Sequence, residues 1–280
     1  MKYLLLTLLL GATLAPHSQA AERLAVGTKF SKIFEQDADG QWQGLGVDVL
    51  RILAARAGDT VRFTIYPWPR AQAMVERAQA DILVGPYKSP ERLKQFAFID
   101  QPFYRDLLVF YARRDDDQPW HGDLAQLKSR RIAAVRGWHY GPQFDLARRS
   151  LDVSEVPQLE NGAQMLAYGR VDLLASNERN SAAVMGALKL DEQLVVLCPA
   201  ITQLDGYLAF PRGPKFSALR DRYNALFAQM VKSGELARLG AKNGVLVPAA
   251  DTDNHTDAST RSARLSAQCT GKHEQGRPQR

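Results

Sequence analysis

The chain has 280 residues, of which 45% are hydrophobic, and a formal net charge of +6, which allows one large domain or two modest ones. Its basic residues are spread along the sequence and form no clustered stripe, so we expect no nucleic-acid partner. Beyond the N-terminal segment, no apolar stretch approaches the roughly 20 residues that a transmembrane helix needs, so we do not expect an integral membrane protein.

The first twenty residues have the pattern of a secretory signal peptide. Lys2 supplies a positive start, residues 4–14 form an apolar run, and small residues at Ser18 and Ala20 stand where a signal peptidase cleaves. A membrane anchor is the alternative, but the run is too short to span a bilayer. We therefore expect cleavage after Ala20 and a mature protein in the periplasm.

Between residues 23 and 247, β-rich runs alternate with amphipathic helical patterns. Strands are expected at 23–27, 61–65 and 81–84, and apolar residues at helical spacing predict helices near 47–53 and 71–75. This alternation is typical of the α/β class, with parallel sheets covered by helices. After Pro248 the sequence becomes polar, and residues 249–280 are expected to form a disordered tail.

A repeated arrangement predicts two similar lobes. Met74 stands seven residues before Asp81, where a buried strand begins, and Met165 stands seven residues before Asp172, where another begins. We expect the chain to cross between the lobes along 106–112 and to return near 201–206, with its last helices (216–230 and 234–239) packed on the first lobe. The predicted boundaries are 21–110 and 204–248 for lobe 1 and 111–203 for lobe 2.

The sequence contains no recognisable catalytic or metal-binding motif. There is no Gly-x-Ser-x-Gly, no glycine motif for phosphates and no Cys-x-x-Cys, and no histidine lies within ligand spacing of another histidine or a cysteine. We therefore expect a protein that is not an enzyme and has no cofactor or metal. Cys198 and Cys269 could pair in an oxidising compartment, and the sequence leaves that question open.

The segment that follows the strand at 81–84 predicts an anion-binding arginine. Ser89 can cap a helical turn that Pro90 opens, and Arg92 would then project toward the ligand cleft. Its planar guanidinium suits a carboxylate. The alternative is a surface arginine that pairs with Glu91 or Asp100.

A turn in the second half of the chain is another candidate. Gly137, Trp138 and His139 lie between a predicted strand at 132–135 and a helix that opens at Pro142, where free N–H groups can bind an anion. The alternative is a turn whose glycines only relieve strain. Aromatic residues near the same strand ends could enclose the apolar part of a ligand: Phe30, Trp68, Tyr87, Trp138 and Tyr140. Trp68, expected on a rigid loop between two prolines, is the strongest of these.

The combined order of motifs resembles the bacterial extracellular solute-binding proteins of family 3, the amino-acid-type receptors of ABC importers. The resemblance runs from about residue 23 to 247 and rests on these segments: 44–48, 81–85 with 89–92, 96–104, 134–137, 169–172 and 207–212. It implies the type II periplasmic binding protein fold, with two lobes of mostly parallel sheet and helices joined by two hinge strands. It also implies a monomer that delivers a small polar solute to an inner-membrane ABC permease.

The resemblance further implies which residues bind the ligand. Arg92 matches the arginine that holds the ligand's α-carboxylate, Gly85 and Tyr87 match the contacts just before it, the turn at 137–141 matches the carboxylate cradle of the second lobe, and Phe30 and Trp68 fall near the aromatic walls.

Two residues depart from the family pattern. Asn177 stands where an Asp usually holds the ligand's α-ammonium, and Tyr87 stands where a Thr or Ser is usual. An asparagine can accept a hydrogen bond but supplies no charge. We therefore expect a carboxylate-bearing solute, an amino acid or a related polar compound, with the neighbouring Glu178 as a further contact.

Two other functions stay open. One is an enzyme on the same scaffold, because periplasmic dehydratases of prephenate or arogenate resemble this family; it would need a general acid, for which Glu178 is the nearest candidate. The other is a stand-alone sensor that docks on a membrane signalling protein.

Overall fold

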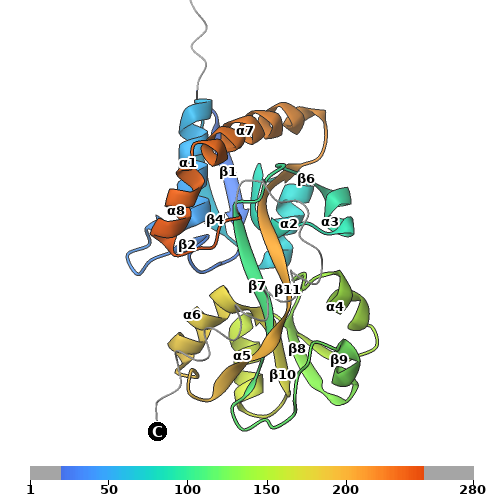
Figure 1. Ribbon diagram of the computed structural model, residues 1–280. Helices are drawn as coiled ribbons and strands as arrows, with labels where there is room; N and C mark the ends of the chain where they lie inside the picture. The colour runs from blue at the N-terminus through green and yellow to red at the C-terminus, as the bar shows by residue number, and fades with distance from the viewer. Residues whose placement is uncertain (1–19, 249–280) are drawn as a thin grey trace, which may run out of the picture.

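The computed structural model describes residues 20–248, which form two lobes joined by two long strands (Figure 1). The first lobe contains β1 (Glu22–Gly27), β2 (Glu35–Gln36), β3 (Trp42–Gln43), α1 (Leu45–Ala57), β4 (Thr60–Ile65), α2 (Trp68–Glu76), β5 (Ile82–Tyr87), α3 (Pro90–Gln95), β6 (Phe96–Phe98), α7 (Pro214–Lys232) and α8 (Glu235–Asn243). The second contains a 3₁₀ helix (Leu124–Ser129), β8 (Arg131–Val135), α4 (Pro142–Ala147), β9 (Asp152–Val156), α5 (Leu159–Ala167), β10 (Leu173–Asn177) and α6 (Glu178–Leu188). The connecting strands are β7 (Tyr104–Arg113) and β11 (Leu194–Pro211).

The strands follow the order β4-β1-β5-β11-β7-β10-β8-β9, and β6 also pairs with β11. Three parallel strands stand at each end of this order, and the antiparallel pair β7 and β11 joins them. The α/β class and the two-lobed fold are thus confirmed. The return strand is longer than predicted, because a register shift between Leu197 and Thr202 lets β11 continue from one lobe into the other.

The hydrophobic core is divided in the same way. One cluster fills the first lobe, and two clusters cover the two faces of the second lobe's strands. Along β8, Ala133 and Val135 belong to one of these clusters and Ile132 and Ala134 to the other, as the alternation of side chains along a strand requires. The lobe boundaries given above stay a prediction.

The two aspartates of the predicted repeat have equivalent roles. The Asp81 carboxylate accepts the N–H of Leu24 at 2.8 Å, and the Asp172 carboxylate accepts the N–H of Arg131 at 2.9 Å. The N–H of each aspartate in turn donates to the carbonyl of the same partner. Each pair therefore closes the beginning of a buried parallel strand, where backbone groups need partners.

The predicted signal peptide, apart from Ala20, and the predicted tail lie outside the described residues. Within residues 20–248, no helix is long and apolar enough to cross a membrane. Cys198 is disulfide-bonded, and Cys269 lies outside the described part of the chain.

Candidate functional site

Eight of the ten predicted site residues meet where the two lobes face each other, a region that we call the waist. They line one small pocket and come from both lobes: Phe30, Trp68, Gly85, Tyr87, Arg92, Trp138, His139 and Asn177. The pocket has a volume of about 10 Å³, close to that of a single water-sized probe. These side chains are therefore packed against one another in the described conformation.

Arg92 is held at the pocket by a short capped helix. The Ser89 hydroxyl accepts the N–H of Arg92 at 3.2 Å, which confirms the predicted cap of α3. The buried guanidinium donates to the carbonyl oxygens of Tyr87 (3.0 Å) and Gly137 (2.9 Å). Among the described residues, neither Glu91 nor Asp100 forms a hydrogen bond or an ion pair with this guanidinium, although the charge of Glu91 acts on it. Burial lowers the pKa of Arg92 to about 10, so the side chain is still a cation at neutral pH.

The Gly137 turn contacts the first lobe through its carbonyl group. Trp68 Nε1 donates to the same oxygen at 3.2 Å, so α2 and α3 both bind this turn. Gly137 has φ 75°, a left-handed conformation that favours glycine. The turn connects the lobes by accepting hydrogen bonds from first-lobe side chains.

The predicted anion cradle in this turn holds a carboxylate of the chain itself. The N–H of Tyr140 donates to Asp145 at 3.3 Å, and Nδ1 of His139 faces the same carboxylate. The N–H of Trp138 donates to the carbonyl of Val135 at 3.2 Å. In this conformation, the N–H groups of Trp138 and Tyr140 and Nδ1 of His139 therefore face acceptors of the second lobe itself.

Three of the predicted aromatic residues lie close together, and two details of the prediction need correction. The ring centroid of Phe30 lies 5.2 Å from that of Trp68 and 6.1 Å from that of Trp138. Trp68 is the first residue of α2 and not a loop residue, because Pro69 is favourable in the first turn of a helix. Tyr140 belongs to the core: it is fully buried, and its hydroxyl accepts the N–H of Val135 at 2.8 Å.

A second arginine that the sequence analysis did not indicate, Arg179, lies beside the pocket with its side chain 10% exposed. Arg179 donates to both carboxylate oxygens of Asp106, at 2.9 and 2.7 Å, and the Tyr87 hydroxyl donates to the same carboxylate at 2.6 Å. Burial alone would lower the pKa of Arg179, but the Asp106 charge offsets it and raises that pKa. Burial and the same carboxylate raise the pKa of Tyr87, which stays neutral. Two signals were available: Asp106 directly precedes the apolar run 107–112 of a predicted strand, and Arg179 lies close to Asn177 in the sequence.

The first turn of α6 forms another contact between the lobes. Asn177 caps this helix, since its Oδ1 accepts the N–H of Asn180 at 2.9 Å. Oδ1 of Asn180 accepts the N–H of Ser31 at 2.9 Å, and Arg179 donates to the Ser31 carbonyl. Both backbone polar groups of Ser31 are therefore bound to the second lobe.

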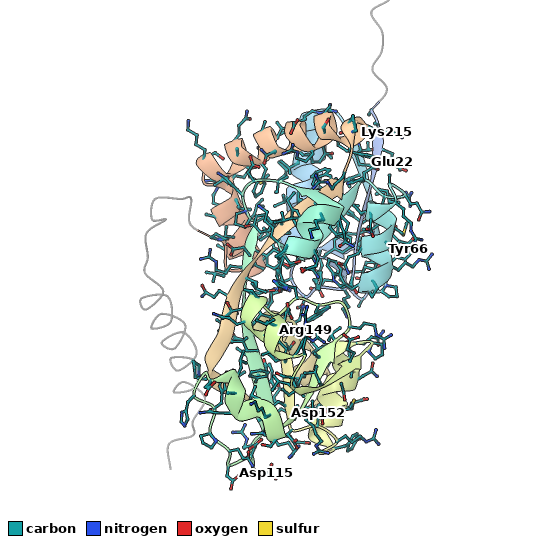
Figure 2. The ribbon with its side chains drawn as sticks, turned by 90° about the vertical axis from the view of Figure 1, so that its right-hand side faces the viewer. Glu22, Tyr66, Asp115, Arg149, Asp152 and Lys215 are labelled. Carbon is teal, nitrogen blue, oxygen red and sulfur yellow. The ribbon has the colours of Figure 1, made fainter. Side chains whose placement is uncertain are left out.

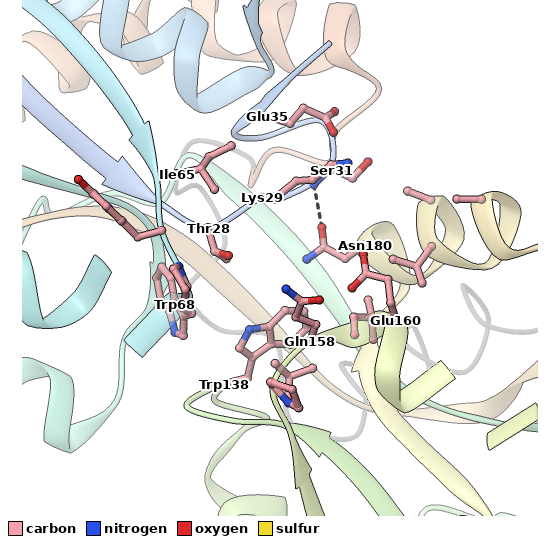
Figure 3. A pocket seen from close by; sticks show the side chains of 18 of the residues that line it. Thr28, Lys29, Ser31, Glu35, Ile65, Trp68, Trp138, Gln158, Glu160 and Asn180 are labelled. Atoms are coloured by element: carbon pink, nitrogen blue, oxygen red, sulfur yellow. Dashed lines mark hydrogen bonds between the residues drawn. The ribbon is translucent and has the colours of Figure 1, made fainter. Parts of the chain in front are cut away.

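A larger cavity adjoins the small pocket (Figure 3). Its volume is about 530 Å³, within the range of small-molecule sites, and it shares Trp68 and Trp138 with the small pocket. Its polar lining residues are Thr28, Lys29, Ser31, Glu35, Gln158, Glu160 and Asn180. Tyr66, another lining residue, lies near the waist in the side view, far from Lys215 and Asp115 at the two ends of the molecule (Figure 2).

Glu178 does not join the other predicted residues. It lines a separate cavity of about 490 Å³, together with Arg179, Ala182 and Leu246. Its neighbour Asn177 lines the small pocket, so the two adjacent side chains point to different places. The structure therefore places Glu178 apart from the eight predicted residues that line the small pocket.

Two α/β lobes on a pair of crossing strands, with a cavity between them, define the class of periplasmic binding proteins. The chain belongs to the bacterial extracellular solute-binding proteins, family 3, whose model matches residues 24–244. No curated protein matches the sequence.

Solved structures with the same fold are distant in sequence. A histidine kinase sensor domain with similarity to periplasmic binding proteins is 24% identical, with a TM-score of 0.72 over 82% of this chain and 99% of that one. An ancestral arginine-binding protein bound to arginine is 16% identical, with a TM-score of 0.67 and coverage of 80% and 98%. An ABC uptake transporter substrate-binding protein from Streptococcus pneumoniae with bound histidine is 14% identical, with a TM-score of 0.67 and coverage of 79% and 91%.

Proposed function

We propose that this protein captures a small carboxylate-bearing solute between its lobes, in the periplasm, and delivers it as a monomer to an inner-membrane ABC permease. The observation that carries the proposal is Arg92, a buried cation at the cleft whose partners are neutral carbonyl oxygens. The charges of Asp145 and Glu91 act on this cation from farther away, but no carboxylate is hydrogen-bonded to it, so an anion that bound it directly would stabilise it strongly. Family membership and the arginine- and histidine-bound structures support a small polar ligand, an amino acid or a related compound.

Ligand capture would proceed by exchange at the Arg92 guanidinium. Bending of β7 and β11 separates Gly137 from Arg92 and opens the small pocket. A carboxylate then takes the place of the Gly137 carbonyl and binds the planar guanidinium with two charge-assisted hydrogen bonds, which are stronger than those to a neutral carbonyl. The rings of Phe30, Trp68 and Trp138 enclose the apolar part of the ligand.

A thermal-shift screen of the purified protein tests this proposal. A carboxylate-bearing ligand should raise the Tm by mass action. The shift should disappear in Arg92→Met, which keeps the side-chain length and removes the cation. A broad panel of amino acids and organic acids without any shift, or a shift that Arg92→Met retains, would contradict the proposal.

A second candidate is ligand sensing, favoured by the similarity to the histidine kinase sensor domain. Transport and sensing both need lobes that close on the ligand, so only an experiment in cells can distinguish them. Deletion of the gene should abolish uptake of the labelled ligand if the role is transport. Unchanged uptake with a lost transcriptional response to the ligand would favour sensing.

We propose binding without catalysis. The enzyme alternative needs a general acid at the ligand, and Glu178 lines a different cavity. Incubation with prephenate or arogenate should therefore give no aromatic product, and formation of that product would contradict the proposal.

A further inference from the structure

Both asparagines at the beginning of α6 have their amide oxygens bound to donors of the chain. Oδ1 of Asn177 accepts the N–H of Asn180. Oδ1 of Asn180 accepts the N–H of Ser31 and Nη1 of Arg179, each at 2.9 Å. An amide held in this way has a fixed orientation and presents its NH₂ group to other partners. Both asparagines therefore face the cleft as hydrogen-bond donors.

The amino group of Asn180 stands out among the described residues. Asn180 is 5% exposed, and its Nδ2 atom is buried without a hydrogen-bond partner. The side chain lines the 530 Å³ cavity, where Figure 3 shows it extending from α6 toward Ser31. An unsatisfied buried donor costs about 1–3 kcal/mol, which an acceptor on a ligand would recover. The cavity thus has a position built for an oxygen atom.

The small pocket also contains donors. Arg92 and Asn177 both line it, and the indole N–H of Trp68, a third lining residue, already donates to the Gly137 carbonyl. The carbonyl of Gly85 already accepts the Tyr104 hydroxyl at 2.8 Å. The nearby carboxylate of Asp106 is paired with Arg179. An ammonium group requires acceptors, so its burial in the small pocket would be costly; the carboxylates of Glu35 and Glu160 line the larger cavity only.

We propose that the joined pockets take an organic anion with oxygen acceptors at both ends, of which a dicarboxylate is the simplest. One carboxylate binds Arg92 and a second oxygen group binds Nδ2 of Asn180. An α-ammonium group on the same ligand weakens binding. This inference rests on the proposed function and specifies its substrate class.

Three matched pairs of probes test the inference by calorimetry: succinate with L-aspartate, glutarate with L-glutamate, and adipate with L-2-aminoadipate. The members of a pair differ only in the α-ammonium group. At least one dicarboxylate should bind, with a Kd about tenfold or more below that of its amino counterpart.

Two substitutions locate the effect. Asn180→Asp keeps an oxygen for Ser31 and Arg179 but removes the donor, and should weaken the bound dicarboxylate at least about tenfold. Asn177→Asp keeps the helix cap and supplies a charge, so it should favour the amino member of each pair. Asn161→Asp, which makes the same change at an exposed position of α5, is the control and should leave binding unchanged.

The outcomes separate this inference from the proposed function. Tighter binding of an amino member, unchanged affinity in Asn180→Asp, or no binding of any probe would overturn the inference. In that case, if an amino acid or another carboxylate binds and Arg92→Met abolishes its binding, the proposed function stands although the inference fails. If no carboxylate binds, both fail.

Discussion

The two arginines at the waist, Arg92 and Arg179, differ in what balances their charge. Arg179 faces the carboxylate of Asp106 and lies over the ring of Tyr104, with 5.2 Å between its Cζ atom and the ring centroid. Arg92 faces two carbonyl oxygens and the ring of Trp68, at 5.6 Å. A neutralised pair is complete within the protein, whereas a cation among neutral dipoles can gain much from an anion. We therefore assign Arg179 to the structure of the waist and Arg92 to the ligand.

The largest expected effect comes from leaving Arg179 without its counter-charge. Asp106→Ala should lower the free energy of unfolding by about 3–5 kcal/mol, because it leaves a buried cation unpaired and removes the acceptor of the Tyr87 hydroxyl. Urea denaturation monitored by tryptophan fluorescence measures the change.

The control replaces both charges. Asp106→Leu combined with Arg179→Met should be clearly more stable than Asp106→Ala, since apolar side chains can substitute for a buried ion pair. A double variant as unstable as the single one would show that the loss has another origin, such as the bonds of Arg179 to Ser31 and Asn180.

The next largest effect concerns the hydroxyl of Tyr87, which donates to Asp106, while the carbonyl of the same residue accepts from Arg92. Tyr87→Phe removes a buried hydrogen bond to the Asp106 carboxylate and should destabilise the protein by about 2 kcal/mol, the value for a hydrogen bond to a charged group. The same denaturation experiment in the Asp106→Leu, Arg179→Met background should show a much smaller change. An equal loss in both backgrounds would contradict the role given to this bond.

Much of this arrangement could be predicted from local patterns. Ser89 before Pro90 predicts a capped turn, and the structure has it, since the residues that form it lie within four positions of one another. The aspartates at 81 and 172 mark two equivalent strands because each acts beside its own strand. Such features depend on neighbours in sequence or on a repeated supersecondary unit.

The pairing of Asp106 with Arg179 could not be predicted in the same way. The two residues are 73 positions apart and meet where α6 packs on the crossing strand β7. The donor character of Asn180 likewise depends on Ser31, 149 positions away. These contacts arise from the docking of the lobes, which no local pattern encodes. Glu178 shows the opposite error, because adjacency to Asn177 does not place a side chain in the same pocket.

A smaller effect tests how Arg92 is positioned. Ser89→Ala removes the side-chain cap of α3 and should destabilise the protein by about 1 kcal/mol. Because Arg92 belongs to that first turn, ligand affinity should fall as well, although the guanidinium is intact. Ser89→Asp, which can also cap, should restore both properties; restored stability without restored affinity would contradict the positioning role.

The smallest expected effect on stability belongs to the residue with the largest expected effect on binding. Arg92→Met removes two hydrogen bonds to carbonyl oxygens, but it also removes a buried charge that has no carboxylate as a hydrogen-bond partner, so the free energy of unfolding should change by less than about 1 kcal/mol. The Gly137 carbonyl keeps the Trp68 indole as a donor, which limits the loss further. Calorimetry with the best carboxylate should detect no binding to this variant. A large loss of stability in Arg92→Met would mean that both arginines maintain the waist, and the distinction between them would fail.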